Sequence, residues 1–446
     1  MFTHPRSGGI PTRRFKIQAT LGPASTNLET LRQMADAGMD ACRLNMSHCS
    51  HDLGKTLVAT IRRLSAETGR PIAVGADLRG PKLRIGEVEG GRVLLDRGAR
   101  LDLVSGRRPS DDRTISVDYR FLAEDVRPGS AILLNDGAIV LRVVETWRET
   151  VICHVEKGGT LTSRKGINLP GVPLRVPSLT NKDLDDLTFA VSNGADFLFL
   201  SYARSAQHIR EVRRVMERLG ARLPLVAKIE RQEGVDALAE IVDEADGICI
   251  ARGDLGIETP LGSVPEIQRQ AVRLCRQAGR FAMMGGQVLS SMVESPIPLR
   301  AEVSDVAAAV RDGMDALVLS DETAVGAYPI EAVRAAAQIA AWTEQAVARD
   351  REAGRPDGAQ AGESGAVVVV SRDGSAARWL SVSRGASRIL AIVDRPLEAN
   401  WLSTCWGVVP VLVEDCADGA AVRAAIEAAV AAHPEFASAR VLEQRP

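Results

Sequence analysis

Three charged side chains at the ends of two apolar runs could together hold an anion and a metal ion. Lys228 and Glu230 close the run 225–230, and Asp254 follows a second apolar run beside Gly253. Because alternate residues of a strand face the same side, we predict that Lys228 and Glu230 project together. A lysine, two carboxylates and a backbone that a ligand can approach indicate a site for an anion held by a divalent metal ion. The alternative interpretation is a set of surface ion pairs at strand ends.

The overall composition limits the classes of protein and partner. The 446 residues include 55 basic and 57 acidic side chains, and this near-neutral balance disfavours a general nucleic-acid binder. The seven cysteines form no CxxC pair, which fits a reducing compartment better than a disulfide framework. No apolar run approaches the length of a membrane span, so we predict a soluble cytoplasmic protein without a membrane partner.

The elements that must position these residues alternate between short apolar runs and amphipathic helical segments. Eight runs are predicted as buried strands, at residues 15–20, 41–45, 72–77, 196–201, 225–229, 247–251, 281–285 and 316–320. A helix after each strand implies parallel pairing, and eight such strands close a (β/α)8 TIM barrel. An open, doubly wound sheet is the alternative architecture.

Two further regions differ from the barrel pattern. Residues 83–177 combine glycine-rich turns with short alternating runs, which predicts an inserted β domain at the carboxyl end of the barrel strands, where a lid would lie. The barrel would then comprise residues 1–82 and 178–345. Residues 346–365 have the composition of a linker, and residues 366–446 predict a small C-terminal α/β domain.

Polar residues gather after the predicted strands rather than before them. Arg43, Asn45 and Ser47 belong to the second strand end, Asp77 to the third and Ser320 to the eighth. One-sided clustering of this kind is typical of a barrel active site. An arginine and a lysine beside two carboxylates suit phosphoryl transfer, which needs positioning and charge stabilisation more than a covalent nucleophile.

Seven motifs follow one another in a specific order along the chain. They are KIQATLGPAS (16–25), RLNMSH (43–48), NLPG (168–171), AKIE (227–230), ARGDLGIE (251–258), RAEVSDVA (300–307) and LS with ETA (319–320 and 322–324). In order and spacing the chain resembles the pyruvate kinase family over nearly its whole length. The resemblance implies an α/β fold in which a TIM barrel carries an inserted β-barrel lid domain and a small C-terminal α/β domain. It also implies the glycolytic reaction of phosphoenolpyruvate with ADP to give pyruvate and ATP.

The resemblance also implies a role for each matching residue. Lys228 would be the transition-state lysine, Arg43 the phosphate contact and Ser320 a further catalytic residue. Substrate binding would involve Arg43, Lys228, Gly253, Asp254 and Gly286, with Glu230 and Asp254 as ligands of Mg²⁺ or Mn²⁺. The nucleotide would contact Asn45, His48, Arg84 and Lys165. The family's K⁺ site would correspond to Asn45, Ser47 and Asp77.

Three residues depart from the family pattern near this site. Lys82 stands where the family has a glutamate, and a tethered ammonium can replace a cation, so we predict a K⁺-independent enzyme. Gly286 stands where the family has a threonine that helps to protonate the enolate, and loss of such a group can cost about 10²–10⁴-fold in rate. Asp321 replaces a glycine and adds a charge beside Ser320.

The C-terminal domain is expected to be reduced, with the chain stopping before the family's last strands. Residues 371–375 only partly resemble the loop that binds effector phosphates, so sugar-phosphate activation is not expected. A homo-oligomer, a tetramer by family analogy, is expected.

Three functions stay open. They are an active pyruvate kinase, a weakened paralogue that binds phosphoenolpyruvate and nucleotide as a sensor, and a barrel lyase with a Mg²⁺–enolate site. The inserted domain and Lys165 argue against the lyase, which needs no nucleotide lid.

Overall fold

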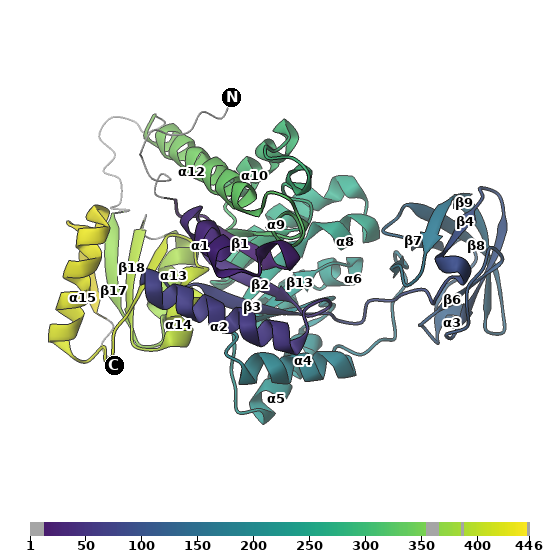
Figure 1. Ribbon diagram of the computed structural model, residues 1–446, viewed down its shortest axis with the longest axis horizontal. Coiled ribbons are helices and arrows are strands. Elements are labelled where there is room, and N and C mark those ends of the chain that lie inside the picture. The colour runs from purple at the N-terminus through teal and green to yellow at the C-terminus, as the bar shows by residue number, and fades with distance from the viewer. Residues whose placement is uncertain (1–12, 354–364, 385–387, 444–446) are drawn as a thin grey trace.

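The computed structural model describes residues 13–353, 365–384 and 388–443 of the chain. Figure 1 shows three parts in a row, with the barrel in the middle. The inserted β domain lies at one end of the molecule and the C-terminal domain at the other. Any communication between these two domains must therefore pass through the barrel.

Eight parallel strands form a closed barrel at the centre of the molecule. They are β1 (Lys16–Leu21), β2 (Ala41–Asn45), β3 (Ala73–Leu78), β12 (Phe197–Leu200), β13 (Leu225–Ile229), β14 (Gly247–Ala251), β15 (Phe281–Gly285) and β16 (Ala316–Leu319). The ring closes because β1 pairs with both β2 and β16. The predicted barrel is confirmed, each predicted strand lies within one residue of the observed one, and the open sheet is wrong.

Helices follow the strands around the barrel. They are α1 (Leu28–Asp36), α2 (His51–Thr68), α4 (Asn181–Ser192), α5 (Ala206–Arg218), α7 (Leu238–Glu244), α9 (Val264–Ala278), α10 (Arg300–Asp312) and α12 (Pro329–Ala353). Side chains define their starts: Asn27 accepts a hydrogen bond from the amide of Thr30, and Ser50 one from Leu53. Short helices α6 (Gln232–Asp236), α8 (Arg252–Glu258) and α11 (Asp321–Ala324) lie after β13, β14 and β16, beside the predicted site.

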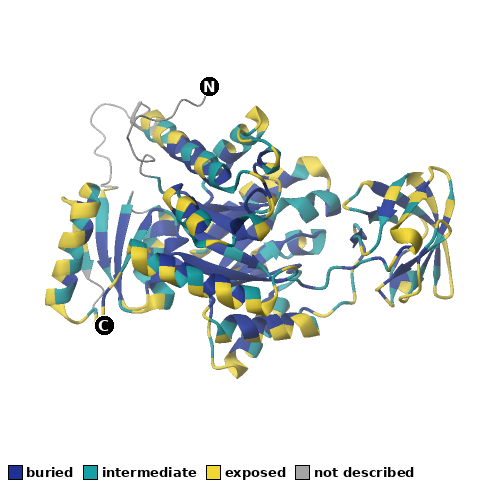
Figure 2. Cartoon of the chain, in the orientation of Figure 1, coloured by how far each residue is buried: buried dark blue, intermediate teal, exposed yellow. Residues whose placement is uncertain are grey.

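The interior of the barrel is filled by side chains and is not a channel. Phe197, Phe199, Phe281 and Met283 form this core together with Trp401 from the C-terminal domain. Figure 2 shows the barrel strands as a buried layer beneath half-exposed helices. Gly75 leaves the space that the Phe197 ring occupies, because a Cβ there would collide with that ring. The lower part of the barrel is thus tightly packed and supports the polar residues above it.

The insertion has a hydrophobic core of its own. Its strands are β4 (Arg92–Leu95), β5 (Arg100–Ser105), β6 (Thr114–Val117), β7 (Ala131–Leu134), β8 (Ile139–Trp147), β9 (Thr150–Lys157), β10 (Gly159–Thr162) and β11 (Ile167–Asn168), with a short helix α3 (Leu122–Asp125). Rather than one closed ring, the strands form a six-stranded sheet, β11-β7-β8-β9-β5-β6, and a two-stranded sheet of β10 and β4. The insertion is therefore a β domain of two sheets.

The C-terminal domain is a parallel sheet with helices. Strands β17 (Ala366–Val370), β18 (Arg388–Val393), β19 (Val408–Leu412) and β20 (Arg440–Glu443) lie in the order β19-β18-β17-β20, with α13 (Ser375–Ser383), α14 (Pro396–Ser403) and α15 (Gly419–Ala432) between them. The edge strand β20 is short and is not predicted from the sequence. Helix α12 continues to Ala353, so the first part of the predicted linker is helical. Residues 354–364 of that linker lie outside the described residues.

The C-terminal domain is joined to the amino end of the barrel by specific polar contacts. Lys16 Nζ donates to the carbonyl of Val408 at 2.8 Å, and Asn400 Nδ2 donates to Asp196 Oδ1 at 2.9 Å. Glu344 of α12 accepts the indole N–H of Trp406 at 3.1 Å. These bonds hold the domain against the barrel. In the described part of the chain, no helix has both the length and the apolar character needed to cross a membrane.

Candidate active site

Lys228 lies at the centre of a buried cluster of charges at the carboxyl end of the barrel strands. Its Nζ lies 3.0 Å from Glu230 Oε1 and 3.2 Å from Asp77 Oδ2, and it donates to Ser201 Oγ at 2.8 Å. Lys228 and Glu230 therefore meet, as the alternation of the strand predicts. Burial alone would lower the pKa of Lys228, but the carboxylates of Asp77 and Glu230 raise it above its usual value. The side chain stays a cation.

Asp77 connects this lysine to the arginine of the second strand. The carboxylate accepts Arg43 Nε at 2.6 Å and Ser201 Oγ at 3.1 Å, in addition to Lys228. Arg43 also donates to Thr20 Oγ1 at 2.9 Å. Burial would raise the pKa of Asp77, yet Lys228 and Arg43 hold it below its usual value. Asp77 is thus a buried anion that positions two cations toward the same space.

A cavity of about 140 Å³ opens above this cluster. Seven predicted site residues line it: Arg43, Lys228, Glu230, Gly253, Asp254, Gly286 and Ser320. Its other walls are Phe199, Cys249, Ala251, Gly285 and Val318, several of which also belong to the barrel core. A Cβ on Gly253 would meet no atom within 4 Å, so the backbone at the start of α8 borders open space. A small anion could approach that backbone directly.

Glu230 and Asp254 supply the oxygen ligands that a divalent cation requires. Glu230 Oε2 accepts the amide of Tyr202 at 2.6 Å, which orients the carboxylate. Burial raises the pKa of Glu230, and the charges of Asp254 and Asp77 add to this effect against the opposing charge of Lys228. Among the described residues no three His, Cys, Asp or Glu side chains lie close enough to hold a metal ion by themselves. The pair fits Mg²⁺, which takes one or two carboxylates and completes its shell with substrate and water.

The predicted nucleotide residues lie outside this cavity and on two different parts of the chain. Asn45 and His48 belong to β2 and the turn after it, and the amide of His48 donates to the carbonyl of Asn45 at 3.0 Å. Arg84 and Lys165 lie at the base of the insertion, where the backbones of Arg84 and Gly166 form an antiparallel β-bridge. None of the four lines this cavity.

A buried latch at the base of the insertion is not predicted from the sequence. Arg231 donates to the carbonyls of Leu169 and Val172 at 3.3 and 3.1 Å, and its Nη1 lies 3.2 Å from Glu258 Oε1. Glu258 also accepts Asn168 Nδ2 at 2.8 Å. Arg231 directly follows Glu230 and Asn168 begins the NLPG motif, but neither position shows from sequence that the two residues share a partner. The latch ties the returning end of the insertion to Arg231, beside Glu230, and to Glu258 at the end of α8.

Sequence comparisons with known proteins identify the family of this chain. Residues 12–333 match the family model described as pyruvate kinase, barrel domain, and residues 358–440 match pyruvate kinase, alpha/beta domain. The chain is 38% identical to pyruvate kinase 2 of Synechocystis over 420 residues, which is 90% of this chain and 71% of that protein. It is 41% identical to pyruvate kinase of Mycobacterium tuberculosis over 334 residues, 75% of this chain and 71% of that protein. The chain belongs to the pyruvate kinase family.

The ammonium of Lys82 pairs with a different carboxylate from the one expected if it replaced K⁺. The resemblance implies that this ammonium replaces the K⁺ of the site formed by Asn45, Ser47 and Asp77. In the structure Lys82 Nζ lies 2.9 Å from Asp254 Oδ1, whereas the oxygens of Asp77 accept Arg43, Lys228 and Ser201. The Oδ1 of Asn45 accepts the amide of Ser47 at 3.1 Å. The lysine therefore neutralises a candidate metal ligand rather than the carboxylate of the expected K⁺ site.

Gly286 stands where the pyruvate kinase pattern has a threonine. Its backbone conformation is one that a threonine could not adopt easily. Its φ is +84°, and a Cβ would lie 2.7 Å from the amide nitrogen of Gly253. Arg252 holds this conformation, since it donates to the carbonyls of Gly286 and Gln287 and forms an ion pair with Asp305 at 2.7 Å. At Gly286 the missing hydroxyl thus coincides with a left-handed backbone that Arg252 holds.

We expect the substitution Gly286→Thr to lower both stability and activity rather than to restore a proton donor. The left-handed backbone and the contact with Gly253 should lower the free energy of unfolding by about 1–3 kcal/mol. Thermal unfolding and steady-state kinetics measure the two effects. Gly253→Ala is the matched control, because a Cβ there meets no atom within 4 Å. A Gly286→Thr variant that is faster than the parent and equally stable would contradict this expectation.

Proposed function

We propose that this chain transfers the phosphoryl group of phosphoenolpyruvate to ADP and so forms pyruvate and ATP. The observation that carries the proposal is the position of Lys228, a permanent cation held between Asp77 and Glu230 at the wall of a cavity. Phosphoryl transfer needs charge stabilisation at a defined point in a site that excludes water. Lys228 supplies that charge on a rigid strand.

The remaining cavity residues support defined roles in this reaction. Arg43 would hold the phosphate as a fork of N–H donors, oriented by Asp77. The backbone at Gly253 would receive the substrate carboxylate. Glu230 and Asp254 would hold Mg²⁺ or Mn²⁺, and such an ion would supply positive charge to offset the negative charge that develops during the transfer. Lys82 would leave Asp254 when the ion binds.

Protonation of the enolate needs a donor other than Gly286. Among the described residues that line the cavity, Ser320 carries the hydroxyl group. Its amide donates to Glu322 Oε2 at 2.7 Å, so the residue is held at the start of α11. We assign Ser320 to this proton transfer, directly or through a water molecule. Asn45, His48, Arg84 and Lys165 would bind the nucleotide once the insertion closes over the barrel as a lid.

One assay tests the proposal and separates the two alternative functions. Purified protein is incubated with phosphoenolpyruvate, ADP and Mg²⁺ while ATP and pyruvate are both followed. Equal amounts of the two products are expected. Binding of both ligands without turnover would instead indicate a sensor. In a parallel incubation with another keto acid in place of phosphoenolpyruvate, formation of pyruvate without ATP would indicate a lyase.

We further propose that the reaction needs no K⁺, because Lys82 brings a tethered cation to the site. Initial rates in potassium chloride and in choline chloride of equal ionic strength are expected to agree, since equal ionic strength removes differences in screening. The Lys82→Met variant tests the cause, because it removes the tethered ammonium and should lower the rate in both salts. Strong activation of the parent protein by K⁺ would contradict the prediction.

Two broader expectations accompany this function. We propose a cytoplasmic location, which fits the unpaired cysteines of the sequence. We also propose a homo-oligomer, a tetramer by analogy with the family. Size-exclusion chromatography with light scattering measures the oligomeric state.

A further inference from the structure

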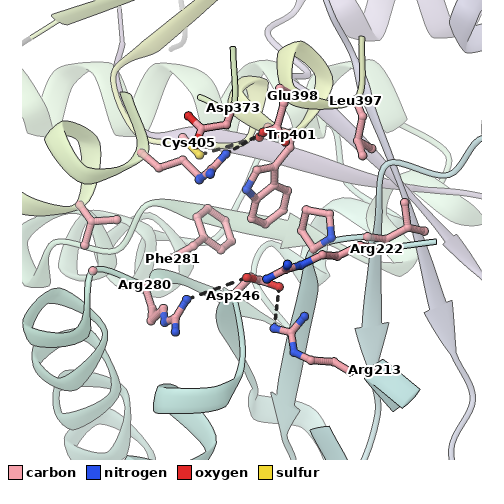
Figure 3. Close-up of a pocket in the computed structure, with 15 residues that line it drawn as sticks. Arg213, Arg222, Asp246, Arg280, Phe281, Asp373, Leu397, Glu398, Trp401 and Cys405 are labelled. Atoms are coloured by element: carbon pink, nitrogen blue, oxygen red, sulfur yellow. Dashed lines mark hydrogen bonds and ion pairs between the residues drawn. The ribbon is translucent and has the colours of Figure 1, made fainter. Parts of the chain in front are cut away.

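A second and larger cavity lies at the other end of the barrel. Its volume is about 380 Å³, and it opens between the amino ends of the barrel strands and the C-terminal domain (Figure 3). Leu223 and Pro224 precede β13, Phe281 begins β15, and Leu397 and Trp401 belong to α14. The volume falls in the range of about 300–1,000 Å³ that is typical of small-molecule sites. None of the residues assigned to the active site lines it.

The barrel wall of this cavity carries more positive than negative charge. Arg213 and Arg280 share one carboxylate, that of Asp246, at 3.0 and 3.9 Å (Figure 3). Asp246 also accepts the amide of Leu225 at 2.8 Å. Arg222 lines the same wall, is exposed, and makes no hydrogen bond or ion pair with a described residue. Three guanidinium groups thus lie at this wall with one carboxylate.

The acidic residues of the opposite wall are satisfied by the C-terminal domain itself. Arg378 lies 2.6 Å from Glu398, and Asp373 Oδ1 accepts the amide of Ser375 at 3.0 Å. In contrast, Arg280 Nε on the barrel side is buried without a hydrogen-bond partner among the described residues. Arg222 therefore offers the cavity a cationic donor that has no partner among the described residues.

Between the two charged walls lies an apolar surface. The rings of Phe281 and Trp401 have centroids 5.6 Å apart and an interplanar angle of 59°. Val382 and Leu397 of the C-terminal domain complete the surface. Aromatic and aliphatic walls of this kind bind a flat apolar body, and arginine forks bind carboxylate or phosphate.

We propose that this cavity binds a small organic anion in which a carboxylate or a phosphate is attached to a flat apolar body. The anionic group contacts Arg222 and Arg280 at the barrel wall. The apolar body lies against Phe281 and Trp401, so the ligand bridges the barrel and the C-terminal domain. The side chain of Trp401 lines this cavity and is also part of the barrel core, so a change in its fluorescence reports binding of the ligand.

Calorimetric titration of the full chain with benzoate and with phenyl phosphate tests the proposal and shows which anion is preferred. At least one of the two is expected to bind. Inorganic phosphate and benzyl alcohol, which carry the charge or the ring alone, are expected to bind about tenfold more weakly or not at all. The proposal is wrong if neither aromatic anion binds, or if one of the partial ligands binds equally well.

Three variants locate the binding site. Arg222→Glu should weaken binding by about tenfold or more, since a charge-assisted hydrogen bond is lost. Arg218→Glu, an equal change of charge at a nearby exposed position outside the cavity, should have little effect. Gly253→Leu fills the active-site cavity and should leave binding unchanged. Equal effects of the two glutamate variants, or loss of binding in Gly253→Leu, would overturn the proposal.

Discussion

Replacing Lys228 by methionine is expected to lower kcat for ATP formation by about 10³-fold or more. The methionine keeps most of the length of the side chain but removes the cation that faces the cavity between Asp77 and Glu230. Because that charge acts on the transferring group, the loss should appear in kcat more than in KM. Steady-state kinetics with phosphoenolpyruvate, ADP and Mg²⁺ measure both parameters.

Two comparisons make the Lys228 result interpretable. Loss of the ammonium also leaves the negative charges of Asp77 and Glu230 with less positive charge beside them. Breaking a buried ion pair can cost about 3–5 kcal/mol of stability. Thermal unfolding must therefore be recorded beside the kinetics. Lys182→Met is the matched control: Lys182 pairs with Asp186 on α4 at 2.6 Å and does not line the cavity. A folded Lys228→Met variant that keeps a tenth of the parent kcat would rule out the proposed role.

The barrel and the cluster at its carboxyl end could be predicted because both follow from local patterns. Buried parallel strands read as continuous apolar runs, and their polar ends in a barrel must meet on one face. For this reason Arg43, Lys228, Glu230 and Asp254, scattered over two hundred residues of sequence, could be expected to line one cavity. The meeting of Lys228 and Glu230 needed only the two-residue period of a strand.

The contacts of long side chains could not be predicted in the same way. Whether Lys82 would reach Asp254 or Asp77 depends on the path of the loop after β3 and on which carboxylate already has partners. The latch made by Arg231 depends on where the insertion returns to the barrel, a hundred residues after it left. The backbone of Gly286 depends on Arg252, which holds its carbonyl from a neighbouring strand end. Each of these is a tertiary contact that sequence periodicity does not contain.

Strand β20 could not be predicted from the sequence for a different reason. Its four residues lie at the edge of the C-terminal sheet, where Val441 is 48% exposed. Its residues, Arg440–Glu443, lack the apolar run that marks a buried strand. The interior strands β17 and β18 contain such a run.

Replacing Trp401 by alanine is expected to destabilise the protein by about 3–5 kcal/mol. The side chain is only 3% exposed, although it comes from the C-terminal domain. It packs against Phe197 and Phe281 inside the barrel, with ring centroids 5.3 and 5.6 Å away. Its removal opens a cavity in a rigid core and separates two domains at once.

Thermal unfolding followed by circular dichroism measures this loss, and Trp379 provides the matched control. Trp379 belongs to the same domain, on α13, but is 63% exposed, so Trp379→Ala should change the melting temperature little. Trp401→Phe should recover part of the stability, because a smaller ring still fills some of the space between Phe197 and Phe281. Equal melting temperatures for the two alanine variants would show that packing between the barrel and the C-terminal domain does not depend on Trp401. Polar bonds such as those from Lys16 and Asn400 would then account for the attachment of the domain.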